Sequence, residues 1–201
     1  MVSRRVLAAI LPIAFQLASP SATSAEISPL DRQRLIAHLE MTGSWVQDEL
    51  AGLSPSQLSF RPAPDSWSIL EVLDHLVVVG SIYWNDLQAA LKTPLSKRSL
   101  LNTDADLLWY GIDRTSREKA IPTELPKGQP RALTALLDDY RRNHARLLEY
   151  AKTTKDELRN FYVARQGCDA YQWALLISTH EQRHILQIRE IKAHPKFPRA
   201  Q

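Results

Sequence analysis

The stretch Asp169-Ala-Tyr-Gln-Trp-Ala-Leu-Leu-Ile-Ser-Thr-His-Glu-Gln-Arg-His-Ile-Leu-Gln-Ile-Arg-Glu-Ile-Lys-Ala193 decides the fold class of this chain of 201 residues. Its large apolar residues recur three or four positions apart, or at multiples of that spacing: Trp173, Leu176, Ile177, Ile188 and Ile191. This spacing predicts one long helix over 169–193, which Pro195 closes.

Three other stretches show the same helical spacing, at about 29–51, 68–92 and 130–152. Ser68 and Glu71 form a Ser-x-x-Glu capping box at the start of the second stretch, and Ser28 is a suitable cap for the first. Glycine is scarce, and no alternating pattern is long enough to indicate a strand. The sequence therefore predicts an all-α fold, a four-helix bundle within one domain spanning 26–201.

The connection between the second and third predicted helices is long, about 37 residues over 93–129. A short loop would force these helices to run antiparallel, whereas a long connection can cross the bundle and let them run parallel. We therefore expect an up-down-down-up order, with a short helical turn near 106–111 inside the crossover.

The first 25 residues resemble a secretory signal peptide. Arg4 and Arg5 precede a mostly apolar run over 6–17, and small residues follow up to Ala25. The run is short for a bilayer crossing and contains Pro12. We expect cleavage after Ala25 and a periplasmic or secreted protein without stable membrane insertion; an uncleaved anchor and an ordinary helix are the alternatives.

The composition argues against a nucleic-acid partner. The formal charge is +3, and removal of residues 1–25 takes away two of the 25 basic residues and no acidic one, which leaves 23 against 22. The single cysteine, Cys168, cannot form an internal disulfide. We interpret it as a small packed residue, with a reactive thiol or a metal ligand as alternatives.

The segment His180-Glu-Gln-Arg-His184 carries the clearest chemistry. Two histidines four positions apart lie on one face of a helix, about 6 Å apart along its axis, so that both imidazoles can reach one metal ion. The same segment matches the His-Glu-x-x-His signature of zinc proteases. Only 17 residues follow His184, and Gln187 stands where one protease class needs glycine, so we reject that reading.

A third ligand has to come from another helix. His194 lies too far along the same helix, and His38 and His144 stand in charged surroundings typical of surface histidines. His75 lies in the middle of the second, mostly apolar helix. Taken alone, it is more typical of a hydrogen-bonded core histidine than of a ligand.

Two stretches resemble the DinB-like proteins, a family of damage-inducible four-helix bundles. These are Arg61-Pro-Ala-Pro-Asp-Ser-Trp-Ser-Ile-Leu-Glu-Val-Leu-Asp-His-Leu76, and Asp169-Ala-Tyr-Gln-Trp173 with the later His180–His184 segment. In that family, one histidine of the second helix and two of the fourth bind a metal, often zinc or nickel. The resemblance implies that His75, His180 and His184 are the metal ligands here.

The resemblance leaves the activity open between a metal-dependent hydrolase, a thiol transferase, a metal-binding envelope or stress protein without turnover, and a metal-free bundle. For a hydrolase, Glu181 and Glu71 are the candidate catalytic carboxylates; the alternatives are a helix-face charge and a cap. Arg183 is either an anchor for an anionic substrate or part of a surface ion pair. We expect an unknown small-molecule substrate, and the family implies a possible homodimer.

Overall fold

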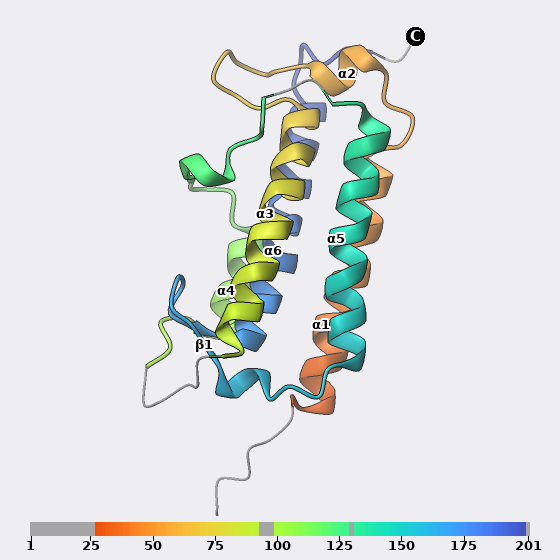
Figure 1. Ribbon diagram of the computed structural model, residues 1–201. Coiled ribbons are helices and arrows are strands. Elements are labelled where there is room, and N and C mark those ends of the chain that lie inside the picture. The colour runs from red at the N-terminus through yellow and green to blue at the C-terminus, as the bar shows by residue number, and fades with distance from the viewer. Residues whose placement is uncertain (1–26, 93–98, 129–130, 200–201) are drawn as a thin grey trace, which may run out of the picture.

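The computed structural model describes residues 27–92, 99–128 and 131–199 and contains four long helices. These are α1 (Pro29–Leu50), α3 (Ile69–Ala90), α5 (Leu133–Thr153) and α6 (Ala170–Lys192). Figure 1 shows α1 and α6 running in one direction and α3 and α5 in the other, which confirms the up-down-down-up bundle. The predicted signal peptide lies outside the described residues.

Shorter elements connect the long helices. They are α2 (Pro55–Ser59), α4 (Asp104–Ile112), η1 (Pro122–Glu124), η2 (Leu158–Asn160) and a hairpin of β1 (Tyr162–Val163) and β2 (Cys168–Asp169). The short turn expected at 106–111 is thus a full helix, α4, packed against α6. The other short elements were not predicted, because strands of two residues and single helical turns are too short to show periodicity.

Polar caps fix where three of the long helices begin. Ser28 accepts from the backbone of the first turn of α1, and Ser68 and Glu71 form the predicted reciprocal capping box of α3. Asp169 forms another capping box, with Gln172, at the start of α6. Because each cap satisfies backbone N–H groups that the helix cannot bond internally, these caps define the helix starts locally.

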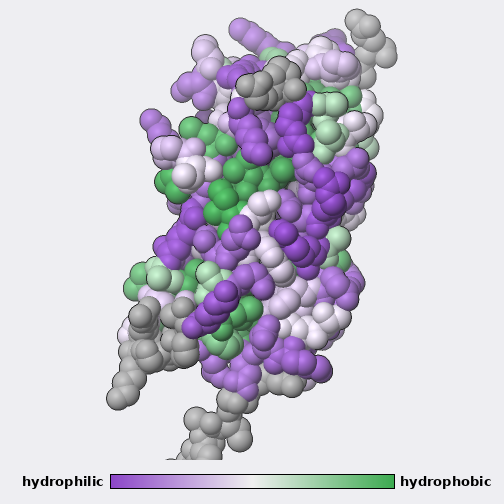
Figure 2. Space-filling model, in the orientation of Figure 1, coloured by the Kyte–Doolittle hydropathy of each residue, from purple (hydrophilic) through white to green (hydrophobic). Residues whose placement is uncertain are grey.

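Helix α6 is buried along nearly its whole length, because α1, α3 and α4 all pack against it. Trp173 is fully buried and donates from its indole nitrogen to the carbonyl of Tyr83 on α3, at 2.8 Å. In Figure 2, hydrophobic side chains gather over α3 and the crossover, and hydrophilic ones over α5. Within the described residues, no helix combines the length and the hydropathy that a membrane crossing needs.

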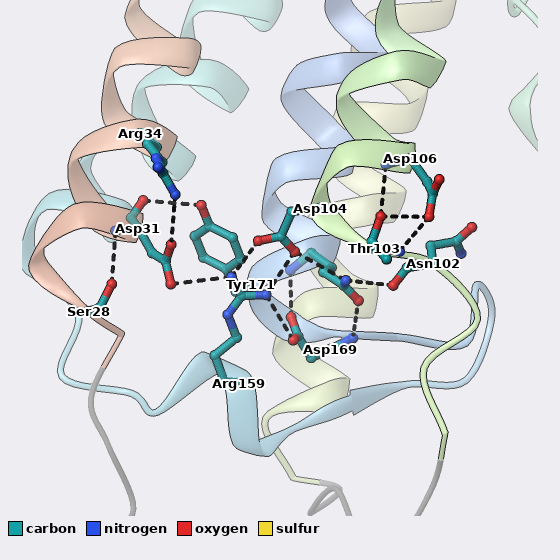
Figure 3. A network of polar contacts seen from close by, with 11 residues as sticks. Ser28, Asp31, Arg34, Asn102, Thr103, Asp104, Asp106, Arg159, Asp169 and Tyr171 are labelled. Atoms are coloured by element: carbon teal, nitrogen blue, oxygen red, sulfur yellow. Dashed lines mark hydrogen bonds and ion pairs between the residues drawn. The ribbon is translucent and has the colours of Figure 1, made fainter.

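One arginine joins the elements at the end of the bundle where α1 and α6 begin (Figure 3). Arg159 of η2 contacts Asp31 of α1 at 3.3 Å, Asp104 of α4 at 2.6 Å and Asp169, the cap of α6, at 3.1 Å. Its guanidinium also lies 3.8 Å from the centre of the Tyr171 ring. One cation therefore bridges three carboxylates that would otherwise repel one another.

Replacing Arg159 with Met should lower the free energy of unfolding by about 1 kcal/mol, because three carboxylates lose their shared cation. The expected effect is modest since 30% of the Arg159 side chain is exposed to solvent. Urea unfolding at low ionic strength measures it. The matched control is Arg34→Met, which removes a 64% exposed side chain 3.8 Å from Asp31 and should have little effect. Equal midpoints for both variants would contradict a structural role for the network.

Candidate metal centre

The structure brings together the three predicted ligands, His75 from α3 and His180 and His184 from α6. The Nε2 atom of His180 lies 3.3 Å from that of His75 and 3.2 Å from that of His184. One nitrogen of each ring lies within 4.8 Å of the others. All three side chains are nearly inaccessible to solvent, with exposed fractions of 2%, 7% and 9% in sequence order.

Two of the imidazoles are oriented by oxygen atoms behind them. Nδ1 of His75 donates to the backbone carbonyl of Glu124 at 2.6 Å, and Nδ1 of His184 donates to Oε1 of Gln187 at 2.8 Å. Because these oxygens accept, the protons sit on Nδ1 and the Nε2 lone pairs of both rings face the cluster. Such an oxygen partner behind a ligating imidazole is usual at metal sites.

The convergence of nitrogens fits a bound cation. A proton on Nε2 of His180 can bond to only one of the two lone pairs that face it, at 3.3 and 3.2 Å. A divalent ion can accept all three nitrogens at once, and imidazole nitrogen is a preferred ligand of zinc and nickel. The donor set therefore fits the ion that the resemblance implies.

Burial keeps the three imidazoles neutral. It lowers the pKa of His180 to about 3, with the neighbouring His75 adding to the effect, and it holds the pKa of His184 well below its ordinary value. Burial also lowers the pKa of His75, although the hydrogen bond to the carbonyl of Glu124 acts in the opposite direction. Neutral imidazole is the form that binds a metal, so the site is ready for an ion at neutral pH.

Aromatic rings enclose the histidines. The ring of Trp67 lies 4.8 Å from that of His75 and, nearly parallel, 6.2 Å from that of His184, centre to centre. The ring of Tyr83 lies 5.6 Å from that of His180. These rings replace water around the ligands and lower the local dielectric, which strengthens the interaction of any bound charge with its ligands.

The two predicted catalytic carboxylates, Glu181 and Glu71, form their hydrogen bonds with residues other than the three clustered histidines. Among the described residues, Glu181 bonds to Thr42 at 2.9 Å and to His144 at 3.2 Å, on the side of α6 that faces α1 and α5. Glu71 bonds to the backbone of Ser68 at 2.8 Å and to the guanidinium of Arg61. The structure thus gives Glu71 the alternative role of a cap, and it gives Glu181 a buried ion pair.

The expectation that His38 and His144 lie on the surface is wrong, because α6 supplies polar partners for both. Nδ1 of His38 lies 2.6 Å from the hydroxyl oxygen of Ser178, and His144 pairs with Glu181. Gly43 of α1 makes the room for His144, since a Cβ there would lie 2.4 Å from its Nε2. Burial lowers the pKa of His144, but the carboxylate of Glu181 outweighs it and the net shift is upward.

Arg183 has neither of the two roles considered for it. Its side chain is buried, and it donates to the backbone carbonyls of Tyr110 at 3.1 Å, of Ser116 at 2.6 Å and of Asp113. These carbonyls belong to the last turn of α4 and the loop behind it. Arg183 therefore satisfies acceptors that the end of a helix leaves unbonded, and it fastens the crossover to α6.

Cys168 is fully buried in β2, where burial and then the neighbouring Asp169 raise the pKa of its thiol to about 12. A thiol with so high a pKa forms little thiolate at neutral pH, and the thiolate is the form that reacts or binds metal. The structure therefore favours the packing role over both alternatives.

Sequence reasoning missed Glu124 and its partner Arg165. The side chain of Glu124 is only 9% exposed and pairs with the guanidinium of Arg165, while its carbonyl bonds to His75. Glu124 lies in the crossover, where no periodic pattern marks a residue as buried. The hydrogen bond to His75 also uses a backbone atom, which carries no signal in the sequence.

Three comparisons with known proteins agree with this fold. The profile of the DinB superfamily matches residues 26–188. The uncharacterized protein YuaE of Bacillus subtilis is 29% identical over 149 residues, which cover 72% of this chain and 89% of YuaE. The solved structure of YfiT from Bacillus subtilis is described as a probable metal-dependent hydrolase with an unusual four-helix bundle topology.

YfiT shares the fold at a TM-score of 0.55 and 16% sequence identity, over 87% of this chain and 91% of its own. At that identity the likeness concerns the fold alone. The family assignment rests on the profile, which spans well over half of the sequence and contains all three histidines. The chain therefore belongs to the DinB superfamily.

Proposed function

We propose that this chain is an exported metal-dependent hydrolase that holds one divalent ion, zinc or nickel, through His75, His180 and His184. The observation that carries the proposal is the convergence of three buried imidazole nitrogens within 4.8 Å of one another. The description of YfiT as a probable metal-dependent hydrolase on the same fold supports the reaction class. The signal-like segment at residues 1–25 supports export.

The residues around the site suit this chemistry. When bound by three protein ligands with one position open, such an ion lowers the pKa of a water molecule to near neutrality. The oxygens of Glu124 and Gln187 hold two ligands in the required tautomer. Trp67 and Tyr83 keep bulk water from the rings. The substrate that we expect is a small molecule.

A metal-binding protein without turnover is the second candidate, and the burial of the site favours it. None of the three histidines is more than 9% exposed. A hydrolase needs a path for substrate, whereas a metal-storage or stress protein does not. The two candidates therefore differ in whether the coordination sphere of the ion admits an external ligand.

Metal analysis tests the site first. The protein, purified without an added His tag, should contain about one equivalent of zinc or nickel by mass spectrometry, and His184→Ala should contain almost none, because two imidazoles hold an ion poorly. His194→Ala is the matched control, since His194 lies outside the cluster of three histidines, and should keep its metal. A wild-type protein that binds no metal even after reloading would refute the proposal.

Cobalt substitution then separates the two candidates. A hydrolase site should show a change in its visible cobalt spectrum when azide is added, because azide occupies the open position. The loaded protein should then hydrolyse members of a panel of activated carboxylic and phosphoric esters, and this activity should disappear in His184→Ala. A cobalt spectrum that azide leaves unchanged, without hydrolysis, would favour the protein without turnover.

A further inference from the structure

Arg165 lies in the turn of the β1–β2 hairpin, ninety residues after His75 in the sequence, but it reaches the surroundings of the metal centre. Gly167, with a φ of 61°, lets this turn close tightly, and the turn lies on the same side of the bundle as η1 (Figure 1). The guanidinium bonds to the carboxylate of Glu124 and lies 3.2 Å from that of Asp86.

Glu124 links this arginine to the first ligand. Its buried carboxylate receives the guanidinium of Arg165, and its backbone carbonyl accepts from Nδ1 of His75 at 2.6 Å. Both groups belong to one residue of a single helical turn, so a displacement of that residue moves both. A buried carboxylate without its cation would turn toward water, since burial of an unpaired charge is costly, and the carbonyl would leave its position behind His75.

Tyr83 links the same arginine to the second ligand. The guanidinium lies over the Tyr83 ring, 5.2 Å from its centre, and that ring lies 5.6 Å from the ring of His180. Burial and the nearby carboxylate of Glu124 raise the pKa of Tyr83 above its ordinary value, so its hydroxyl stays neutral. Arg165 thus contacts one neighbour of His75 and one neighbour of His180.

Besides the bond between Glu124 and His75, the crossover is attached to α3 at the neighbouring residue, Asp74. The backbone nitrogen of Lys127 donates to the carboxylate of Asp74 at 2.6 Å, and Arg131 lies 3.6 Å from the same carboxylate. This attachment holds the chain three residues after Glu124. The contact with Arg165 holds the carboxylate of Glu124 itself.

We propose that Arg165 is a positioning residue for the metal centre, which orients His75 through Glu124 and supports His180 through Tyr83. The proposal rests on the metal site proposed above. The contacts of Arg165 are with Asp86, Glu124 and Tyr83, and not with the three histidines. Its effect is therefore on metal affinity and coordination geometry. Partners behind metal ligands commonly change metal affinity by about 10- to 100-fold.

The test compares zinc affinities of the full chain by competition with a chromophoric chelator. Arg165→Met should weaken zinc binding by about tenfold or more and alter the visible spectrum of the cobalt form. Arg165→Lys, which keeps the charge beside Glu124, should restore most of the affinity. Arg146→Met is the matched control, because Arg146 lies 4.7 Å over the ring of Trp84, away from the three histidines, and should leave zinc affinity unchanged.

The outcomes separate this inference from the proposed function. Equal zinc affinity and cobalt spectra for wild type and Arg165→Met would overturn the role of Arg165 and leave the metal site intact. A wild-type protein that binds no metal would instead refute the site itself. If Arg165→Met does not fold, Arg165→Gln decides, because its neutral amide cannot pair with the carboxylate of Glu124 and should weaken zinc binding; wild-type zinc affinity in Arg165→Gln would overturn the proposal.

Discussion

Replacing Glu181 with Ala should lower the free energy of unfolding by about 3 kcal/mol, because the change leaves the imidazolium of His144 buried without its counterion. The two side chains are only 9% and 11% exposed, so water screens the pair little. Breaking a buried pair typically costs about 3–5 kcal/mol, and we expect the low end because an imidazole can release its proton. The carboxylate also accepts from the hydroxyl of Thr42 at 2.9 Å, and this bond is lost as well.

Urea unfolding at pH 6, where His144 with its raised pKa is charged, measures the effect. Glu181→Gln is the matched control, since the amide keeps a hydrogen-bond acceptor for Thr42 but carries no charge; it should cost less than Glu181→Ala. A double-mutant cycle with His144→Gln should return a coupling energy of at least about 1 kcal/mol.

The same variants separate the structural role of Glu181 from the catalytic one. If Glu181 acts only as a partner of His144 and Thr42, Glu181→Gln should keep its metal and most of any hydrolytic activity. A variant of unchanged stability that loses hydrolysis while retaining its metal would assign Glu181 to the reaction instead.

Much of the fold could be predicted from the sequence because its signals are local. Apolar spacing and the caps at Ser28 and Ser68 mark helices without reference to the rest of the chain, and the length of the crossover determines the parallel pair. The three histidines were found because two share one helical segment and the third lies in a motif of the family. Apart from the length of the crossover, each of these signals can be read within a single helical segment.

The rest of the site depends on contacts between distant segments. The partners of Glu181 come from α1 and α5, and the carbonyls that accept from Arg183 belong to the end of α4 and the loop after it. Arg183 looks like a solvated charge on a helix face in the sequence, but it is buried because α4 and the loop after it cover it. The pairing of Glu124 with Arg165 joins residues 41 positions apart, and neither lies in a pattern that indicates burial.

The metal-free protein should lose stability as the pH falls below 6.5. The histidines of the unfolded chain bind protons in this range, whereas the buried histidines of the folded site stay neutral. Burial lowers the pKa of His180 to about 3, from an ordinary value of 6.5. The contribution of such a group is complete above its unfolded pKa and is lost progressively as the pH falls toward its folded pKa. Between pH 7.5 and 5.0, His180 alone should account for about 2 kcal/mol.

The other two ligands act in the same direction, since the pKa of His75 and that of His184 are also lowered. His144 acts in the opposite direction: its pKa is raised, so its contribution is present below 6.5 and is lost as the pH rises through its folded pKa. Burial also lowers the pKa of His38. Four histidines therefore lose stability in acid and one gains it, and the net change is a loss. The buried carboxylates matter mainly below this range.

Urea unfolding in the presence of a chelator, at pH 7.5 and 5.0, tests the prediction in wild type and His180→Gln. The wild type should lose stability on acidification by about 2 kcal/mol more than the variant does, because the glutamine does not titrate. Saturating zinc should make the wild-type loss steeper, since protons and metal compete for the same nitrogens and acid releases the ion. Identical pH dependence in both proteins would mean that His180 is protonated as readily in the fold as in the unfolded chain, and that its imidazole therefore has access to water.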